Sequence, residues 1–296
     1  MKYRHRFHAG NFADVHKHVT LLALLQLLKR KDKGFLYLET HAGRGAYDLS
    51  QPSAEAAGGI GRFVAAAVAD LDAAADAAPE LREYARLIAH WRAALGRPHL
   101  YPGSPLLALG ALRRQDRVVL IEWLATETRA LDELLQLARA RNCLEAAPRV
   151  HIERGDGYAL MRASLPPPER RALTFLDPPY EETRRDFAAV SAALGEGLRR
   201  FPTGVFAAWY PIKDERTTGA WLTECSRSLS APLLASELWL YPRDARVALN
   251  GSGMLIVNPP WQTLERMQVW LPQLERCLAV GTAGGNSARM LRESPP

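Results

Sequence analysis

The feature that most constrains the fold is a regular alternation of apolar and amphipathic segments between residues 117 and 212. Short apolar runs are typical of buried strands, whereas the segments between them repeat apolar residues at helical spacing. The apolar runs are RVVLIEW, VHIERGDG, ALTFLDPPY and GVFAAWYPI, and the amphipathic segments are TETRALDELLQLAR, YALMRASL and RRDFAAVSAALGEGLRR. Strands and helices that alternate at this pitch form βαβ units, so the pattern predicts an α/β fold with a mostly parallel sheet.

The segments on either side extend this sheet to seven strands. Residues 11–31 have the spacing of a helix that Asn11 caps with Asp14 in its first turn, and residues 35–43 form an apolar run that ends in a glycine turn. Near the end of the chain, ASELWLYPR and GSGMLIVNPP are two strand-like runs with no helix-length segment between them. A connection this short joins antiparallel strands, so we expect this pair to close the sheet.

Residues 51–97 differ in composition from the rest of the chain, because they consist almost wholly of helix formers with an apolar face. We interpret them as a small helical subdomain inserted into a Rossmann-like domain that comprises residues 1–50 and 98–280. We expect the last segment, residues 281–296, to be a flexible tail. After the insertion, Ser104 precedes a proline and is expected to cap the next helix.

The overall charge favours a polyanionic partner. The 296 residues carry 38 Lys and Arg against 32 Asp and Glu, a formal charge of +6, and a positive excess attracts nucleic acids. The three cysteines are far apart and lack C-x-x-C spacing, so neither a disulfide framework nor a zinc site is indicated. The longest apolar run, residues 19–28, is far shorter than the roughly 20 residues of a membrane span, and no secretory signal is visible. We therefore expect a cytoplasmic protein that contacts no membrane.

Glycines follow the first predicted strand. Gly43 and Gly45 form a G-x-G turn, at the sheet edge where open α/β folds bind their ligands. Asp48 stands where the third glycine of a dinucleotide fingerprint would be, which favours a nucleoside over a pyrophosphate. Taken alone, the turn is equally compatible with an ordinary connection between a strand and a helix.

Carboxylates follow the next two strands. Glu122 ends the second strand and can accept hydrogen bonds from both hydroxyls of a ribose. Asp156, which stands between Gly155 and Gly157, can meet the amino group of an adenine. An isolated acid at such a position is usually just solvated. Three successive strands that end in glycine or acid at one edge, however, predict a nucleoside site.

The fourth strand ends in Asp177-Pro178-Pro179-Tyr180. The lone pair of an exocyclic amine is delocalised into the base, so an enzyme that methylates it needs acceptors that hold the two N–H groups. The carboxylate of Asp177 and the carbonyl of Pro178 are such acceptors, and the ring of Tyr180 can stack on a base turned out of its helix. A rigid loop is the alternative for this motif taken alone.

A second motif with similar atoms, Asn258-Pro259-Pro260-Trp261, follows the last predicted strand. If that strand runs antiparallel, the motif emerges at the opposite edge of the sheet from the nucleoside site. We therefore expect Asn258 to end a strand and Trp261 to pack against the protein.

The first residues, Tyr3-Arg4-His5-Arg6-Phe7-His8, interleave cations with aromatic rings. This pattern suits phosphate contact and base stacking, although a charged and frayed terminus has the same composition. The histidines among the first 41 residues lack the Cys or carboxylate spacing of a metal site, so no metal is expected.

Six segments in order resemble the bacterial 23S ribosomal RNA adenine-N6 methyltransferase J family, and they are YRHRFHAGNFADVHKH, FLYLETHAGRGAYDL, YPGSP, FLDPPYE, WYPIKDE and LNGSGMLIVNPPW. The resemblance runs from Tyr3 to about Trp261. It implies a class I methyltransferase fold with an inserted helical subdomain, which transfers a methyl group from S-adenosylmethionine to the N6 amine of one adenine in 23S ribosomal RNA and releases S-adenosylhomocysteine. No obligatory protein partner is expected.

Together with the motifs above, the resemblance implies roles for individual residues. The donor would be held by His18, His41, Gly43, Ser104, Glu122, Gly155, Asp156 and Asp177. Asp177 would also accept the proton of the amine, with Pro178, Tyr180 and Lys17 beside it. The RNA would be contacted by Tyr3, Arg4 and Arg6.

The sequence leaves alternatives open. The D-P-P-Y motif also serves enzymes that methylate guanine N2 in ribosomal RNA or adenine N6 in DNA. A nucleic-acid-binding protein without catalysis and a nucleotide-dependent oxidoreductase on a similar sheet share parts of the same pattern.

Overall fold

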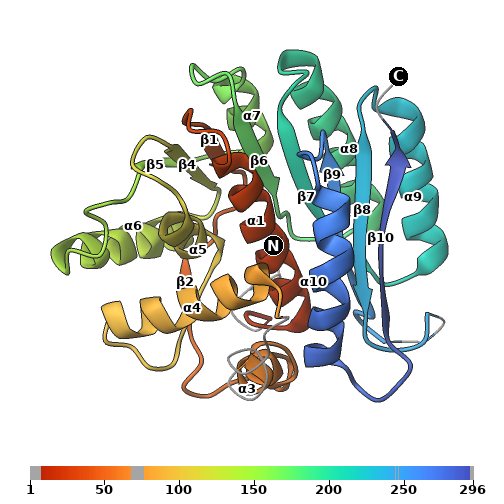
Figure 1. The fold of residues 1–296 in the computed structure, drawn as a ribbon. Coiled ribbons are helices and arrows are strands. Elements are labelled where there is room, and N and C mark those ends of the chain that lie inside the picture. Colours follow the sequence, from red (N-terminus) through yellow and green to blue (C-terminus); the bar gives the residue numbers. More distant parts are fainter. Residues whose placement is uncertain (1–7, 68–76, 244, 246, 294–296) are drawn as a thin grey trace.

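The computed structural model describes residues 8–67, 77–243, 245 and 247–293. An eight-stranded sheet with the strand order β10-β8-β9-β7-β6-β1-β4-β5 carries helices on both faces, as Figure 1 shows, and separates two hydrophobic cores. The predicted Rossmann-like α/β fold is confirmed. The strands of this sheet are β1 (Leu36–Glu39), β4 (Arg117–Glu122), β5 (Arg149–Arg154), β6 (Ala172–Leu176), β7 (Val205–Ile212), β8 (Leu233–Trp239), β9 (Gly251–Val257) and β10 (Gly285–Arg292).

The parallel part of the sheet consists of β5, β4, β1, β6 and β7, which pair in this order. Every residue of β1 and of β6 is buried, as is typical of parallel strands that helices cover on both faces. Because the five strands run in the same direction, the loops that follow β1, β4 and β6 come together at one edge of the sheet.

Two sets of helices cover the sheet. One core contains side chains of α1 (Phe12–Lys29), α5 (Ser104–Ala111), α6 (Ala125–Ala140) and α10 (Thr263–Leu278). The other contains side chains of α7 (Gly157–Ser164), α8 (Thr183–Arg200) and α9 (Glu215–Ser228). Among the described residues, no helix combines the length and the apolar character that crossing a membrane requires.

The end of the chain confirms the predicted antiparallel pair and corrects the expected tail and strand number. β9 lies between β7 and β8 and is antiparallel to both, so the expected closing pair is confirmed. The expectation of a flexible tail is wrong for Gly285–Arg292, because this segment forms β10 and pairs with β8 along the edge of the sheet. The sheet therefore has eight strands, one more than the sequence predicted.

The segment interpreted as an insertion is helical where the structure describes it. It contains α2 (Ala54–Ala56), the π-helix η2 (Ala57–Gly61), α3 (Arg62–Ala66) and α4 (Pro79–Ala94). A two-stranded antiparallel ribbon of β2 (Ala46–Asp48) and β3 (Leu100–Pro102) flanks it on both sides. Apolar side chains of α3 and α4 join the same core as those of α1, so these helices pack on the main domain.

Helix α1 is buried over almost its whole length, which explains why apolar residues occur on all its sides. Asn11 caps it by accepting a hydrogen bond from the backbone N–H of Asp14, as predicted. The imidazole of His16 is fully buried, and its two nitrogens lie 3.0 Å from the hydroxyls of Ser252 on β9 and Ser236 on β8. Burial lowers the pKa of His16 to about 3, so the ring is neutral near pH 7.

This buried histidine predicts a pH dependence of stability. In the unfolded chain the pKa of His16 returns to 6.5, so below that pH the unfolded state binds a proton that the folded state does not. The free energy of unfolding should therefore fall as the pH drops from 6.5 toward 3. Relative to His16→Gln, which cannot titrate, the wild type should lose about 2 kcal/mol between pH 7 and pH 5. Chemical denaturation at the two pH values measures this difference, and equal pH slopes would contradict it.

Candidate active site

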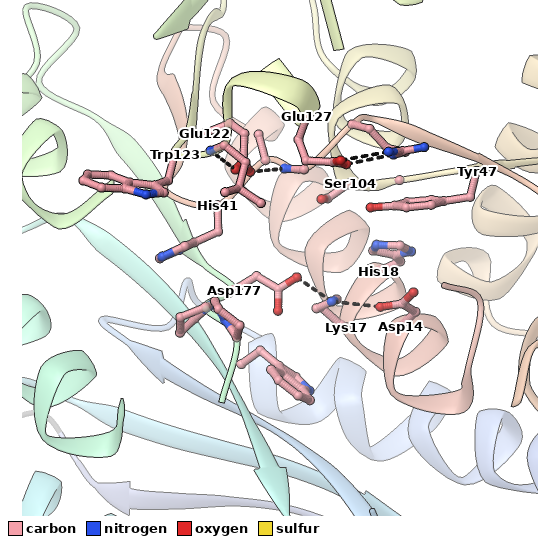
Figure 2. A pocket seen from close by; sticks show the side chains of 18 of the residues that line it. Asp14, Lys17, His18, His41, Tyr47, Ser104, Glu122, Trp123, Glu127 and Asp177 are labelled. Carbon is pink, nitrogen blue, oxygen red and sulfur yellow. Dashed lines mark hydrogen bonds and ion pairs between the residues drawn. The ribbon is translucent and has the colours of Figure 1, made fainter. Parts of the chain in front are cut away.

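A cavity of about 470 Å³ opens at the carboxyl ends of β1, β4 and β6, beside the first turns of α1. Its size is within the range of about 300 to 1,000 Å³ that small-molecule and cofactor sites have. Figure 2 shows side chains from these separate elements pointing into it. The predicted site residues that line it are His18, His41, Gly43, Ser104, Glu122 and Asp177, together with Lys17 and Pro178.

Lys17 lies between two carboxylates in this cavity (Figure 2). Its ammonium is 2.9 Å from Oδ1 of Asp14, one turn earlier on the same face of α1, and 2.5 Å from Oδ2 of Asp177. Burial alone would lower the pKa of Lys17, but Asp14 and Asp177 raise it by more, so the pKa ends above its ordinary value. Lys17 is therefore a permanent cation that fixes the side chain of Asp177.

Glu122 is held at the end of β4 by backbone donors. Its two carboxylate oxygens accept the N–H groups of Gly43 and Leu124, both at 2.8 Å. Burial raises the pKa of Glu122 above its ordinary value, although these two hydrogen bonds oppose the shift. A carboxylate oxygen has a second lone pair, so each can also accept a hydroxyl hydrogen from a ligand.

Ser104 is the first residue of α5, and the predicted cap is displaced by one residue because Gly103 occupies the cap position. The Ser104 hydroxyl instead donates to Oε1 of Glu39, whose other oxygen accepts the Tyr37 hydroxyl at 2.9 Å. Burial raises the pKa of Glu39 to about 8, against the two hydrogen bonds that lower it. Glu39 lies inside the protein and positions the Ser104 hydroxyl at the cavity wall.

Two histidines complete this wall. Nδ1 of His18 lies 2.9 Å from the hydroxyl of Tyr101 on β3. Nδ1 of His41 lies 2.8 Å from the Thr40 hydroxyl, and the His41 ring makes an edge contact with Tyr158. Burial lowers the pKa of His41 to about 4, although nearby acids oppose the shift, so His41 is neutral near pH 7.

The glycine turn allows the chain to come close to the cavity. Gly43 and Gly45 have φ angles of 60° and 77°, a region in which side chains are rarely tolerated. A Cβ atom on Gly43 would lie 3.0 Å from the hydroxyl of Tyr47, and one on Gly103 would lie 3.1 Å from the carbonyl oxygen of Gly45. The volume, the two glycines and the anchored Glu122 together fit a nucleoside-sized ligand.

Three predicted residues lie elsewhere. Gly155 and Asp156 are at the same edge of the sheet but outside the cavity lining that the structure describes, and Asp156 caps α7 by accepting the N–H groups of Tyr158 and Ala159. The expectation that Tyr180 can stack on a base is wrong for this conformation. Tyr180 is 6% exposed, its ring contacts Phe187, and its hydroxyl donates to a backbone carbonyl.

The second proline motif lies at the opposite edge, as predicted from the antiparallel direction of β9. Asn258 has a φ of 52°, and its amide donates to the carbonyls of Pro202 and Gly204, both at 2.8 Å. Asn258 therefore ends the strand and ties it to the start of β7. The expectation that Trp261 packs against the protein is wrong, because its side chain is 78% exposed.

The predicted RNA contacts Tyr3, Arg4 and Arg6 lie outside the described residues. Among the residues that are described, no group of three or more His, Cys, Asp and Glu side chains is arranged to hold a metal ion.

Comparison with known proteins identifies the family. A family model described as ribosomal RNA large subunit methyltransferase D, RlmJ, matches residues 32–291. The chain belongs to this family. The ribosomal RNA large subunit methyltransferase J of Escherichia coli is 36% identical to it over 284 residues, which cover 96% of each chain. The protein of the same name from Haemophilus influenzae is 36% identical over 282 residues, which cover 94% of each.

A solved relative has the same fold. The crystal structure of a Legionella pneumophila protein superposes with a TM-score of 0.81 and 33% sequence identity, covering 95% of this chain and 98% of the other. An experimentally determined structure therefore shares the fold described above over nearly the full chain.

In this member of the RlmJ family, sequence reasoning missed several residues that line the cavity. Asp14 was expected only to start a helix, yet its spacing of three residues from Lys17 already placed the two on one helix face. Trp123 directly follows Glu122 and is 59% exposed at the cavity. Trp209 lines the cavity from β7, and its ring centre lies 5.4 Å from the Lys17 ammonium. The sequence signal for both tryptophans was their position near the carboxyl ends of predicted strands, which is where the cavity opens.

The geometry of Asn258 predicts a structural role for the second proline motif in this RlmJ-family chain. Asn258→Ala removes the two side-chain hydrogen bonds. It leaves a residue with a Cβ atom at a positive φ that these hydrogen bonds no longer stabilise. We expect the free energy of unfolding to fall by about 2 to 4 kcal/mol, while turnover at 25 °C stays within about twofold of wild type because the cavity lies at the other edge.

Denaturation curves and a methylation assay measure the two quantities. Asn258→Gly is the matched variant, since it loses the same hydrogen bonds but tolerates the backbone angle, and it should be destabilised less. A folded but inactive Asn258→Ala protein would contradict the structural role.

Proposed function

We propose that this chain transfers a methyl group from S-adenosylmethionine to the N6 amine of an adenine in 23S ribosomal RNA. One observation carries the proposal. Asp177 and Pro178 of the D-P-P-Y motif line the same cavity as Glu122 and other residues that suit a nucleoside. Membership of the RlmJ family, whose model and two relatives are named as ribosomal RNA large subunit methyltransferases, supports the same reaction.

The donor half of the site is formed by the loops after β1 and β4. S-adenosylmethionine supplies an electrophilic methyl group on its sulfonium sulfur when bound. In our proposal Glu122 accepts hydrogen bonds from the ribose hydroxyls, and the backbone of Gly43 approaches the nucleoside. The hydroxyl hydrogen of Ser104 is already donated to Glu39, so the Ser104 oxygen accepts a hydrogen bond from the amino group at the polar end of the donor. The imidazoles of His18 and His41 form the wall between these groups, and the neutral ring of His41 adds no charge near pH 7.

Gly155 and Asp156 have a weaker place in this proposal. Asp156 accepts the N–H of Tyr158, and the ring of Tyr158 contacts the ring of His41 in the cavity wall. In our proposal Asp156 therefore borders the adenine of the donor. Because Oδ1 of Asp156 accepts the N–H groups of Tyr158 and Ala159 at the start of α7, Oδ2 is the oxygen proposed to face the donor. We therefore keep the two residues as an outer boundary of the donor site.

The acceptor half is formed by the loop after β6. The carboxylate of Asp177 accepts one N–H of the target amine and the carbonyl of Pro178 accepts the other, which draws the lone pair of the nitrogen out of the ring. As the bond from nitrogen to the methyl carbon forms, the bond from that carbon to sulfur breaks. The nitrogen then carries a positive charge, and its proton passes to Asp177, which Lys17 holds in position.

Aromatic and basic groups supply the contacts to RNA in this proposal. Trp209 is the aromatic ring of the acceptor half that lines the cavity, so it takes the stacking role that the sequence assigned to Tyr180. Tyr3, Arg4 and Arg6 precede α1, whose first residues line the same cavity, and they are proposed to contact the RNA backbone and bases. An enzyme with this substrate would act in the cytoplasm, where ribosomal RNA is assembled.

Asp177 provides the sharpest test of the chemistry. Asp177→Ala should lower kcat by at least about a hundredfold, because the acceptor of the amine proton is lost. The affinity for S-adenosylmethionine should change little, since we assign the main donor contacts to Glu122, Gly43 and Ser104. The resemblance also implies a donor contact for Asp177, which we propose to be the weaker of its two roles. Turnover and calorimetric donor binding measure the two effects. Glu181→Gln, an exposed acid in the same loop, is the control. Loss of donor binding to the same extent as kcat would show that Asp177 serves the donor instead.

The substrate is tested by mass mapping of ribosomal RNA from cells with and without the protein. We expect one adenine in 23S ribosomal RNA to lose its N6 methyl group when the protein is absent. In vitro, a transcript with that adenine replaced should not be methylated. Methylation that survives the replacement would favour guanine N2 as the target, and methylation of a DNA duplex would favour the DNA enzyme. Tighter binding of NAD than of S-adenosylmethionine would contradict a methyltransferase.

A further inference from the structure

Asp14 connects the start of α1 to the lysine of the site. Its carboxylate has two different partners, because Oδ2 accepts the backbone N–H of Gly10 at 2.9 Å and Oδ1 accepts the ammonium of Lys17 at 2.9 Å. Its own N–H donates to the side chain of Asn11. The side chain is 3% exposed, so these contacts are shielded from water and hold it in one place.

Gly10 itself is fixed by the helical segment that follows β2. Its carbonyl accepts the N–H of Ile60 on η2 at 2.7 Å, and its φ of 81° is a value that favours glycine. A Cβ atom at Gly10 would lie 2.8 Å from the side chain of Ile60. The backbone that orients Asp14 is therefore itself packed tightly, and Asp14 is held from the side away from Lys17.

Lys17 is thus a cation shared by two carboxylates. The ammonium has three N–H groups, and it reaches Asp14 and Asp177 at 2.9 and 2.5 Å. Coulomb interactions are strong where water is excluded, so an ammonium with only one carboxylate partner would be drawn wholly to that partner. The second carboxylate, Asp14, attracts the ammonium from the other side, so Lys17 does not pair with Asp177 alone.

This sharing matters for the chemistry of Asp177. A carboxylate that is fully neutralised by a bound ammonium is a weaker acceptor for the N–H of an amine and for its proton. Asp177 meets Lys17 through Oδ2 and lines the cavity with its side chain 14% exposed. It can therefore remain oriented by Lys17 and still accept from a base in the cavity.

We propose that Asp14 is a positioning residue for methyl transfer, which anchors Lys17 from the far side and thereby keeps the Asp177 carboxylate oriented and available to the target amine. The inference rests on the proposed function. It identifies Asp14 as the group that determines how strongly the Lys17 ammonium binds the Asp177 carboxylate. Figure 2 shows Lys17 between Asp14 and Asp177, with a dashed line from its ammonium to each carboxylate.

The test is Asp14→Asn, which keeps the size of the side chain and an oxygen for the Gly10 N–H but removes the charge. Lys17 and Asp177 remain as a matched ion pair, so the protein should stay folded. We expect kcat for ribosomal RNA methylation to fall by about tenfold or more, with the KM for RNA and the calorimetric Kd for S-adenosylmethionine within about twofold of wild type. A purely structural defect would change KM and Kd as well.

The matched control is Glu265→Gln, which removes an exposed acid from the first turn of α10 and should leave all three constants unchanged. This turn begins beside Gln262, which meets Arg30 at the end of α1 that is opposite to the cavity. If Asp14→Asn does not fold, Asp14→Ser, which is also neutral and offers an oxygen to the Gly10 N–H, replaces it with the same expected result.

Two outcomes would overturn the inference. A folded neutral variant with wild-type kcat would show that Asp14 has no influence on Asp177. A donor Kd weakened by the same factor as kcat/KM would show that Asp14 binds the donor directly. Wild-type protein is assayed on the same RNA. If the wild type is inactive, the proposed function is wrong. If the wild type is active and the variant is equally active, the role proposed for Asp14 is wrong.

Discussion

The arrangement of the site depends on one positive charge that is buried in the protein. The Lys17 side chain is 4% exposed, and a charge so placed is tolerated only where carboxylates compensate it. One of its partners is Asp14 on the same helix, and the other is Asp177 in the loop after β6. The same contact therefore fixes α1 against the sheet and fixes the D-P-P-Y loop against α1. Stability and site geometry are coupled, because neither element can shift without exposing an unpaired charge.

The fold follows closely from local sequence signals. Apolar runs separated by amphipathic segments specify parallel strands and covering helices, and the short connection between the last two predicted strands specifies their antiparallel pairing. β10 could not be recognised in this way. GNSARMLR lacks an alternation of apolar residues, and the strand forms because β8 offers a free edge and Arg289 reaches the buried Glu237 at 2.7 Å. Such a strand depends on a partner that only the tertiary structure supplies.

The site could be predicted in part. Glycine and acid at strand ends located Gly43, Glu122 and Asp177, because the ends of parallel strands converge at one edge. Contacts between distant segments decided the rest. The ring of Tyr180 turns inward because Phe187 and the carbonyl of Trp209 receive it, and no property of the tetrapeptide reveals this. His18 and Ser104 were reached through the family resemblance, since neither follows a strand of the parallel sheet.

The ribbon of β2 and β3 has a consequence for how this protein family can vary. Gly43 and Gly45 stand just before the ribbon and Ser104 just after it, and the Gly103 N–H donates to the Gly45 carbonyl at 2.9 Å. The two ends of the intervening segment are thus held together by the backbone itself. A change in the length of that segment should therefore leave the spacing of Gly43 and Ser104 at the cavity unchanged, as long as η2 still holds Gly10. The ribbon fixes the distance between the two cavity loops by backbone hydrogen bonds, so this distance does not depend on the length of the chain between them.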